Sequence, residues 1–150
     1  MPEAADPSYS LKALSAFLAL TRASDLMTVR LTSKCDNQRL TFSQFGVLEA
    51  LLAGGALCQK ELGEKIFKSS GNITMVIDNL EKRELVRRER KGNDRRFVTI
   101  HLTDEGNKVI NEVLPKLASF IRDEMKVLTE EEQESLHKMC KKLATLKENA

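Results

Sequence analysis

The stretch that most constrains the fold of this chain runs from residue 69 to residue 106, because its hydrophobic period changes once, from helical to alternating. In its first part, apolar residues recur at i, i+3, i+4 and i+7, which predicts one buried stripe on a helix: Ile73, Val76, Ile77 and Leu80. The hydroxyl of Ser69 or Ser70 can cap the start of this helix. After Arg83 apolar and polar residues alternate, and a Gly-Asn-Asp run at residues 92–94 supplies a turn. The stretch therefore predicts a helix followed by a β-hairpin.

The side of this helix opposite the apolar stripe carries short polar groups and one thioether, which have little reason to be buried. Its residues are Asn72, Thr74, Met75, Asp78, Asn79 and Lys82. A helix face of this kind can enter a groove of DNA and present hydrogen-bonding groups to the base edges.

The positive charge of the chain is concentrated in the same stretch. Residues 82–96 contain eight basic and three acidic residues and carry a net charge of +5, whereas the whole chain carries only +2. A local positive field on a helix and a hairpin is the electrostatic pattern of a phosphate-binding surface. A run of charges alone is also typical of a solvated face, but the polar helix before it favours the first interpretation.

The order of residues in this stretch resembles the winged helix-turn-helix of the multiple-antibiotic-resistance regulator (MarR) family. The similarity rests on Leu80-Glu81-Lys82-Arg83, Leu85-Val86, Asp94-Arg95-Arg96 and Leu102-Thr103-Asp104-Glu105-Gly106, and it extends over about residues 11 to 147. The resemblance implies that the helix reads the major groove and that the hairpin, called the wing, places an arginine in the minor groove. The matching arginine is Arg96, with Asp94 as its orienting partner. The candidate DNA contacts are Ser69, Ser70, Asn72, Thr74, Met75, Asn79, Arg88, Arg90, Lys91, Arg95 and Arg96.

Two positions depart from the family pattern. Met75 stands where many members carry a basic side chain, and a thioether can touch a thymine methyl group but cannot pair with guanine. Glu84 stands where most members carry glycine, which puts a β-carbon at a helix end that favours glycine. We expect an altered base preference from the first departure and modest backbone strain from the second.

Two short capped helices are expected before the polar-faced helix that begins near Ser70, which is called the recognition helix below. The first begins with a capping box and a hydrophobic staple, formed by Thr41 with Gln44 and by Leu40 with Phe45, and runs to about residue 52. The second covers about residues 59–66, with Cys58 at the position of its cap. Two short helices with a tight connection before a polar-faced helix predict a helix-turn-helix.

The two ends of the chain predict long helices with more apolar surface than a small lobe can cover. Residues 8–32 contain no glycine or proline, and their apolar side chains spread over more than one face. Thr103 caps a helix in which Pro115 predicts a kink near residues 111–115. Thr129 begins the last helix with a second capping box. Because wide apolar stripes are costly in water, we expect a two-fold homodimer.

The expected fold class is mainly α with a small β-hairpin wing, organised as a single MarR-like domain over residues 1–150. Its winged helix-turn-helix lobe covers about residues 41–106, and its N- and C-terminal dimerisation helices cover about 8–33 and 104–147. Three cysteines without a C-x-x-C pair argue against a disulfide framework and suit a reducing cytosol. The acidic start does not suit a signal peptide, and no apolar run reaches about 18 residues, so we expect a cytoplasmic protein without a membrane span.

The sequence contains no recognisable catalytic constellation, so we do not expect an enzyme. Two histidines, His101 on the wing and His137 on the last helix, are too few for a triad. His137 and Cys140 share a helix face, but two ligands are half of a zinc site, and no metal or cofactor is expected. Cys58 is a candidate redox sensor, because a helix N-terminus favours a thiolate; the alternative is a plain cap substitute.

These observations predict a homodimeric, sequence-specific DNA-binding transcription regulator. The resemblance further implies a repressor that binds double-stranded DNA at a pseudo-palindromic operator and is released by a small ligand or by oxidation. The ligand expected from the family is a small aromatic or phenolic effector. The alternative is a winged helix that serves as a protein-interaction module without nucleic acid, and the salt dependence of binding would separate the two.

Overall fold

The computed structural model describes residues 7–66, 70–93 and 97–146, and the side chains within these ranges except those of residues 7–10, 70 and 71. The predictions made for Ser69, Asp94, Arg95 and Arg96, and for the side chain of Ser70, lie outside the described residues. The elements are α1 (Pro7–Asn37), α2 (Phe42–Gly54), β1 (Leu57–Cys58), α3 (Gln59–Ile66), α4 (Ser70–Lys82), β2 (Val86–Arg90), β3 (Val98–Leu102), α5 (Asp104–Met125) and α6 (Glu130–Ala144). The predicted class, mainly α with a small wing, is confirmed.

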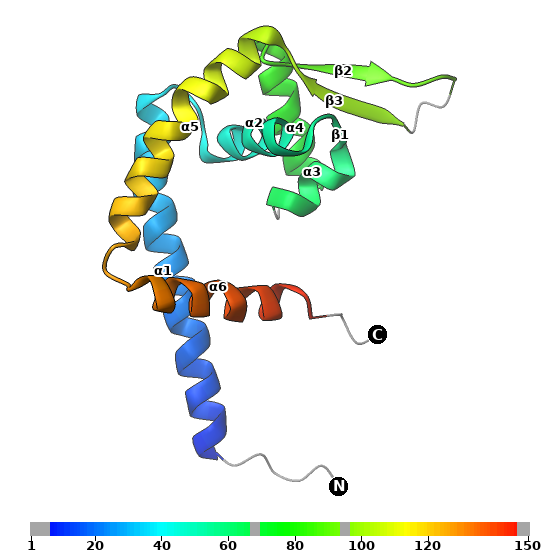
Figure 1. Cartoon of the computed structure of the whole chain (residues 1–150). Coiled ribbons are helices and arrows are strands. Elements are labelled where there is room, and N and C mark those ends of the chain that lie inside the picture. Colours follow the sequence, from blue (N-terminus) through cyan, green and yellow to red (C-terminus); the bar gives the residue numbers. More distant parts are fainter. Residues whose placement is uncertain (1–6, 67–69, 94–96, 147–150) are drawn as a thin grey trace, which may run out of the picture.

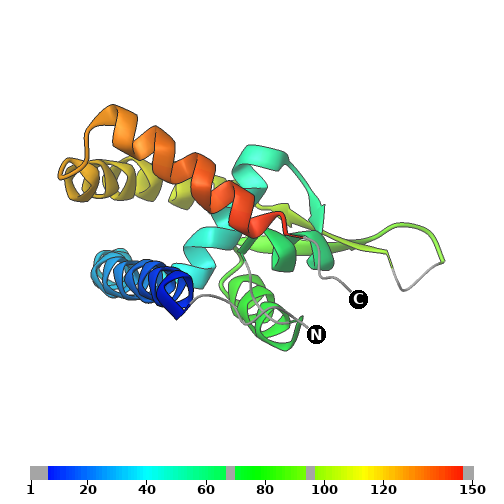
Figure 2. The ribbon, with the colours of Figure 1, turned by 90° about the horizontal axis from the view of Figure 1, so that it is seen from below.

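The molecule consists of a compact lobe and two long helices that leave it. Figure 1 shows α2, α3, α4 and the sheet gathered in the lobe, with the β2–β3 hairpin projecting from it. Helices α1 and α5 extend from the lobe in the same direction, and α6 turns back beneath it. Figure 2, seen from below, shows the hairpin projecting on the side away from α1 and α5, while α6 runs back in the direction of the hairpin. The wing and the two longest helices, α1 and α5, therefore leave the lobe on different sides.

The sheet has three antiparallel strands in the order β1-β3-β2, so β2 is an outer strand. The predicted hairpin pairs Val86 with Leu102 and Arg90 with Val98. Strand β1 was not predicted: it pairs Leu57 with Ile100, and its two residues are too few to show an alternating pattern. The wing is therefore anchored to the segment in front of α3.

The core of the lobe forms where α4 lays its apolar stripe against the sheet and α2. Three of the four predicted stripe residues, Ile73, Ile77 and Leu80, are buried, and Val76 is half-buried. They belong to one cluster with residues of α2, the sheet and α5, including Val47, Leu48, Leu51, Val86, Ile100, Ile110, Val113 and Leu117. Burial of each such side chain contributes about 1.5–3 kcal/mol, so α4 is held by its apolar face and leaves its polar face to solvent.

The helix starts agree with the capping predictions, and one helix end does not. Thr41 and Thr129 form capping boxes, and Thr103 accepts a hydrogen bond from the Gly106 amide. Helix α1 continues to Asn37, beyond the expected end near residue 32, because Cys35 in its last turn is fully buried against the lobe. Helix α5 remains continuous through Pro115, and Figure 1 shows its axis changing direction along its length.

The turn between α4 and β2 is locked to the start of α5. The Thr103 amide donates to the Leu85 carbonyl at 3.1 Å, and the Thr103 hydroxyl donates to the Glu84 carbonyl at 2.6 Å. A β-carbon on Gly106 would lie 1.9 Å from the Leu85 oxygen, so only glycine permits this approach. Glu84 has a φ of 60°, which confirms the expected strain of a non-glycine residue at this helix end.

We predict that Gly106→Ala lowers the free energy of unfolding by about 3 kcal/mol, because the added methyl group collides with backbone that cannot move aside cheaply. The matched control is Gly54→Ala, where the new β-carbon would meet only the Leu57 side chain at 3.7 Å and the change should be under about 1 kcal/mol. Urea unfolding at one protein concentration measures both variants, and equal losses would contradict the assignment.

Candidate nucleic-acid interface

Helix α4 presents an exposed face on the side opposite its buried stripe. Asn72, Thr74, Met75 and Asn79 are all exposed, and Met75 keeps 63% of its surface in solvent. A methionine exposed to this degree on a well-packed lobe is available for contact with a partner. The structure thus brings together the four described candidates for base contact on one helix face.

Thr74 is held by a residue that the sequence had not singled out. The Gln59 side-chain amide, at the first position of α3, donates to the Thr74 hydroxyl at 2.5 Å. This hydrogen bond ties the two helices of the helix-turn-helix together at the exposed face of α4. Gln59 was missed because it lies fifteen residues before Thr74, and only the packing of α3 on α4 makes them neighbours.

The β2–β3 hairpin forms an exposed basic extension. Arg90 at the end of β2 and Lys91 after it are both exposed. Phe97, which precedes β3, has 65% of its surface in solvent, and its carbonyl accepts a hydrogen bond from the Lys91 amide at 3.4 Å. The hairpin therefore carries cations and one aromatic ring away from the lobe, which suits contact with a sugar-phosphate backbone.

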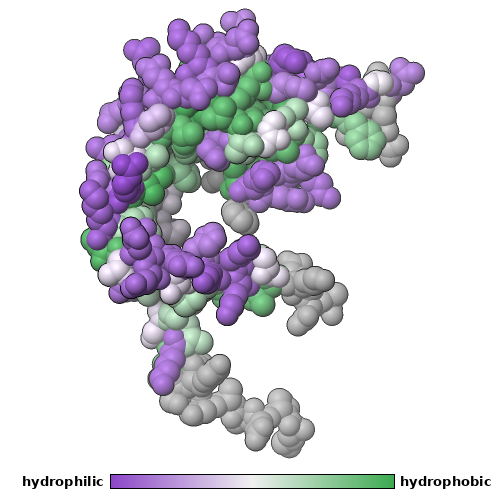
Figure 3. Space-filling view, in the orientation of Figure 1, coloured by the Kyte–Doolittle hydropathy of each residue, from purple (hydrophilic) through white to green (hydrophobic). Residues whose placement is uncertain are grey.

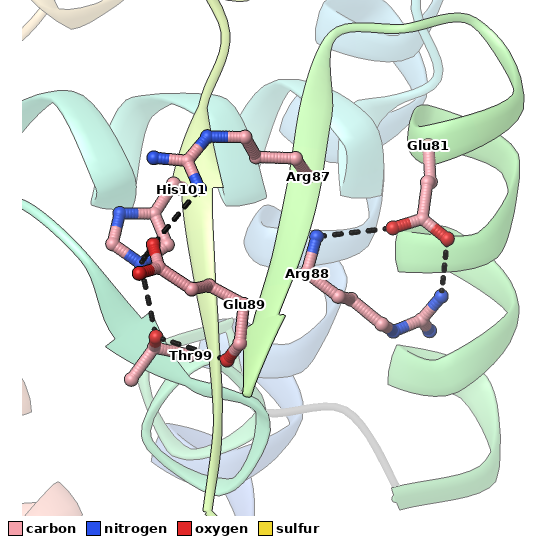
Figure 4. A network of polar contacts seen from close by, with 6 residues as sticks. All are labelled: Glu81, Arg87, Arg88, Glu89, Thr99 and His101. Atoms are coloured by element: carbon pink, nitrogen blue, oxygen red, sulfur yellow. Dashed lines mark hydrogen bonds and ion pairs between the residues drawn. The ribbon is translucent and has the colours of Figure 1, made fainter. Parts of the chain in front are cut away.

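Arg88, a predicted DNA contact, is instead engaged with acidic residues of α4. Its Nη2 lies 2.5 Å from Asp78 Oδ1, and its Nη1 lies 3.1 Å from Glu81 Oε1. The Glu81 carboxylate also accepts the backbone N–H of Arg88 at 3.0 Å (Figure 4). In this structure the charge of Arg88 is therefore balanced within the protein, unlike that of an arginine presented to solvent.

A second polar group lies on the other side of β2. Arg87 Nη1 donates to Glu89 Oε2 at 2.8 Å, and the same oxygen lies 3.1 Å from His101 Nε2 (Figure 4). The Thr99 hydroxyl lies 2.9 Å from His101 Nε2. The hydrogen bond and charge of Arg87 hold the pKa of the Glu89 carboxyl below its usual range. Glu89 therefore stays ionised and screens Arg87 at neutral pH.

The cysteines occupy three different environments. Cys58 is half-buried and precedes α3, where its amide donates to the Glu61 carboxylate at 2.9 Å, the second half of a capping box. Cys35 is buried, and burial raises the pKa of its thiol, which disfavours the reactive thiolate. Cys140 is half-buried on α6. The redox role of Cys58 stays a prediction.

The described residues contain neither a cluster of metal ligands nor a helix able to span a membrane. Within residues 7–66, 70–93 and 97–146, histidine, cysteine and acidic side chains do not gather in any group of three that could hold a metal ion. In the same part of the chain, every helix is too short or too polar to cross a membrane. The exposed face of α4 and the basic hairpin thus remain the main candidate site, and together with α3 they define a winged helix-turn-helix.

Comparison with known proteins identifies the family. The model of the family described as "Transcriptional regulator SarA/Rot" matches residues 30–113. The chain is 33% identical over 132 residues to the HTH-type transcriptional regulator MhqR of Bacillus subtilis, covering 88% of this chain and 91% of that protein. It is 32% identical over 109 residues to the HTH-type transcriptional repressor MdtR of the same species, covering 73% and 70%.

Solved structures agree with this result. AbsC of Streptomyces coelicolor, a MarR family transcriptional regulator, superimposes with a TM-score of 0.79 at 25% identity, covering 87% of this chain and 90% of AbsC. NadR, crystallised in complex with 4-hydroxyphenylacetate, has the same fold with a TM-score of 0.75 at 23% identity, covering 98% and 100%. The chain belongs to the MarR and SarA/Rot type of winged-helix transcriptional regulators. It is therefore a DNA-binding regulator and not an enzyme.

We predict that Met75→Ala and Gln59→Leu change the base preference at the DNA positions that α4 faces, the first by removing a contact and the second by removing the hydrogen bond that Gln59 donates to the Thr74 hydroxyl. The expected loss is about 1–3 kcal/mol of discrimination at one base pair. Selection of duplexes from a random-sequence pool measures this preference. Lys108→Ala, an exposed change on α5, is the control, and identical selected sequences for all four proteins, wild type included, would refute the assignment of the α4 face.

Proposed function

We propose that this protein is a homodimeric repressor that binds a pseudo-palindromic operator in double-stranded DNA and is released by a small aromatic or phenolic ligand or by oxidation. The lobe at about residues 41–106 binds DNA, and the helices at about 8–33 and 104–147 form the dimer. The proposal includes a cytoplasmic location, because the three cysteines are free, as suits a reducing compartment. The observation that carries the proposal is the exposed polar face of α4 beside a basic hairpin, on a lobe from which long helices extend.

The dimer is supported by apolar side chains that a single copy leaves in water. They lie mainly on the long helices and include Leu11, Leu14, Phe17, Leu18, Leu26 and Val29 of α1, Ile121 of α5, and Met139 and Leu143 of α6. Monomeric proteins rarely expose so many large apolar side chains together. Figure 3 shows hydrophilic side chains over the upper side of the lobe and much of the hairpin, with apolar side chains gathered in the middle of the lobe and in smaller areas on the lower helices. A second copy of the chain could cover the apolar side chains of α1, α5 and α6 in one symmetric interface.

Two-fold symmetry explains how such a protein would read an operator. Two recognition helices on one dimer enter successive major grooves when they lie about 34 Å apart, and the two half-sites are then related by the same symmetry. Any change in the distance between the lobes changes the affinity. A repressor of this design is therefore controlled through its geometry, without any chemistry at the DNA.

A cavity of about 500 Å³ between α2 and α3 is the candidate effector site. Phe42 and Phe45 supply aromatic lining, and Glu49 and Lys65 are its charged residues. Ile66, at the end of α3, also lines it, so an occupant would contact the last turn of the helix that packs on α4. NadR, whose fold this chain shares, was solved with a hydroxylated aromatic acid, which suggests 4-hydroxyphenylacetate and uncharged phenol as probes.

Oxidation of Cys58 is a second route to release. Cys58 pairs with Thr99 in the sheet and directly precedes α3, so added oxygen atoms would disturb the junction of sheet and helix. Cys58→Ser keeps a hydroxyl at the cap while removing the thiol. If peroxide releases wild type and this variant equally from DNA, the sensor is elsewhere.

The wing assignment is tested with Arg96→Ala. This variant should bind a selected duplex about 1–3 kcal/mol more weakly, because a guanidinium in a narrow minor groove gains from its negative potential. Asp94→Ala should reproduce part of this loss. Lys91→Ala should weaken all sequences alike and reduce the salt slope by about one if it contacts phosphate. Unchanged affinity of the Arg96 variant in gel-shift titrations would defeat the wing assignment.

The dimer is tested by sedimentation at micromolar concentration. Wild type should sediment as a dimer, and Leu14→Glu with Phe17→Glu should dissociate it or make it aggregate, because charges would enter the apolar surface of α1. Lys108→Glu, on the exposed side of α5 near the lobe, should leave the dimer intact. A folded wild-type monomer at this concentration would refute the proposal.

A further inference from the structure

Strand β2 is an outer strand of the sheet, and one of its outward-pointing backbone N–H groups is bound by a side chain of α4 rather than by another strand. The backbone N–H of Arg88 donates to Glu81 Oε2 at 3.0 Å. The other oxygen of the same carboxylate receives the guanidinium of Arg88 at 3.1 Å. Glu81 therefore holds both the main chain and the side chain of one wing residue, which Figure 4 shows directly.

Asp78 completes the connection one turn earlier on α4. Its Oδ1 lies 2.5 Å from Arg88 Nη2, so the guanidinium bridges two carboxylates on one face of the helix. Only 25% of the Arg88 side chain is exposed. Charge-assisted hydrogen bonds to a planar guanidinium fix orientation as well as distance. The base of the wing is thereby held against the recognition helix by three polar contacts.

The guanidinium of Arg88 compensates the unfavourable position of the Asp78 and Glu81 carboxylates. Both lie in the last turns of α4, where the helix dipole disfavours negative charge. Both also lie beside the basic hairpin that is proposed to approach phosphates. Without Arg88 they would repel DNA and destabilise the end of the helix. With it, they become attachment points for the wing.

We propose that Arg88 is a positioning residue that fixes the angle between the wing and the recognition helix through Asp78 and Glu81, and that sequence-specific binding depends on these two acidic residues. The inference rests on the proposed DNA binding by α4 and the wing. This role replaces the expectation that Arg88 contacts phosphate. The two roles can be distinguished, because they predict opposite effects on DNA binding when the carboxylates are removed. If Arg88 held phosphate, loss of nearby negative charge would strengthen binding; if it positions the wing, the same loss weakens binding.

The chain contains a matched control on the same strand. Arg87 and Glu89 form an ion pair of the same chemical type at 2.8 Å, but the pair lies on the other side of β2 and makes no link to α4 (Figure 4). Glu89→Gln removes one negative charge from the wing without touching the contact between wing and helix. Its effect measures the general electrostatic gain, against which Glu81→Gln and Asp78→Asn are compared.

The experiment uses the full chain and a duplex that wild type selects from a random-sequence pool, titrated at several salt concentrations. Glu81→Gln, Asp78→Asn and Arg88→Met should each bind about three- to tenfold more weakly than wild type, with the salt slope of Arg88→Met unchanged. Glu89→Gln should bind equally well or more tightly. The losses of Glu81→Gln and Arg88→Met should not add in the double variant, because both break one contact.

A second measurement needs no DNA and separates this inference from the proposed function. Hydrogen exchange of the β2 and β3 amides should accelerate in Glu81→Gln and Arg88→Met but not in Glu89→Gln, provided that circular dichroism shows all of them folded. Equal exchange in Glu81→Gln and Glu89→Gln would overturn the inference even if wild type binds DNA well. Tighter binding by Glu81→Gln, or a salt slope reduced by about one in Arg88→Met, would also overturn it and return Arg88 to phosphate contact. If wild type retains no duplex at low salt, the proposed function fails, and the role in DNA binding fails with it.

Discussion

The contact on which the lobe depends is the approach of the first turn of α5 to the turn between α4 and β2. Gly106 allows the Leu85 carbonyl to occupy the space of a β-carbon, and Thr103 binds the same turn through its amide and its hydroxyl. This turn joins α4, the recognition helix, to the wing. It also contacts the first turn of α5, which is one of the long helices. The parts proposed to contact DNA are therefore joined at this turn to α5, one of the helices of the proposed dimer. A change in how the long helices pack would reach the DNA-binding surface through this junction.

The second constraint is electrostatic and acts within the basic region itself. Three acidic residues lie next to particular arginines: Asp78 and Glu81 of α4 bind Arg88, and Glu89 of β2 binds Arg87. The net charge of +5 over residues 82–96 thus attracts DNA at long range. The ion pairs within the protein decide which of the cationic side chains can reach a phosphate. Counting charges along the sequence overestimates the number of available contacts, since part of the charge serves to hold the wing in place.

Several features could be predicted from the sequence because their signals are local. The buried stripe of α4 follows from a helical period, and the caps at Thr41, Thr103 and Thr129 follow from residues three positions apart. The strain at Glu84 follows from one departure in a known pattern, and its φ of 60° confirms it. In each case the interacting groups are near neighbours in the chain, so geometry is set by the backbone conformation alone.

Other features were wrong or missed because they depend on contacts between distant segments. Strand β1 exists because Leu57 meets Ile100, forty-three positions later, and the end of α1 extends because Cys35 finds a buried site. The resemblance to the MarR family was enough to predict the class of protein, and periodicity and composition were enough to place the recognition helix and the positive charge of residues 82–96. Only the tertiary structure decided that Gln59 holds Thr74 and that Arg88 binds α4 instead of facing solvent. The physical reason is that hydrogen bonds and ion pairs act over about 3 Å, so a side chain's partner is settled only when packing brings distant segments together.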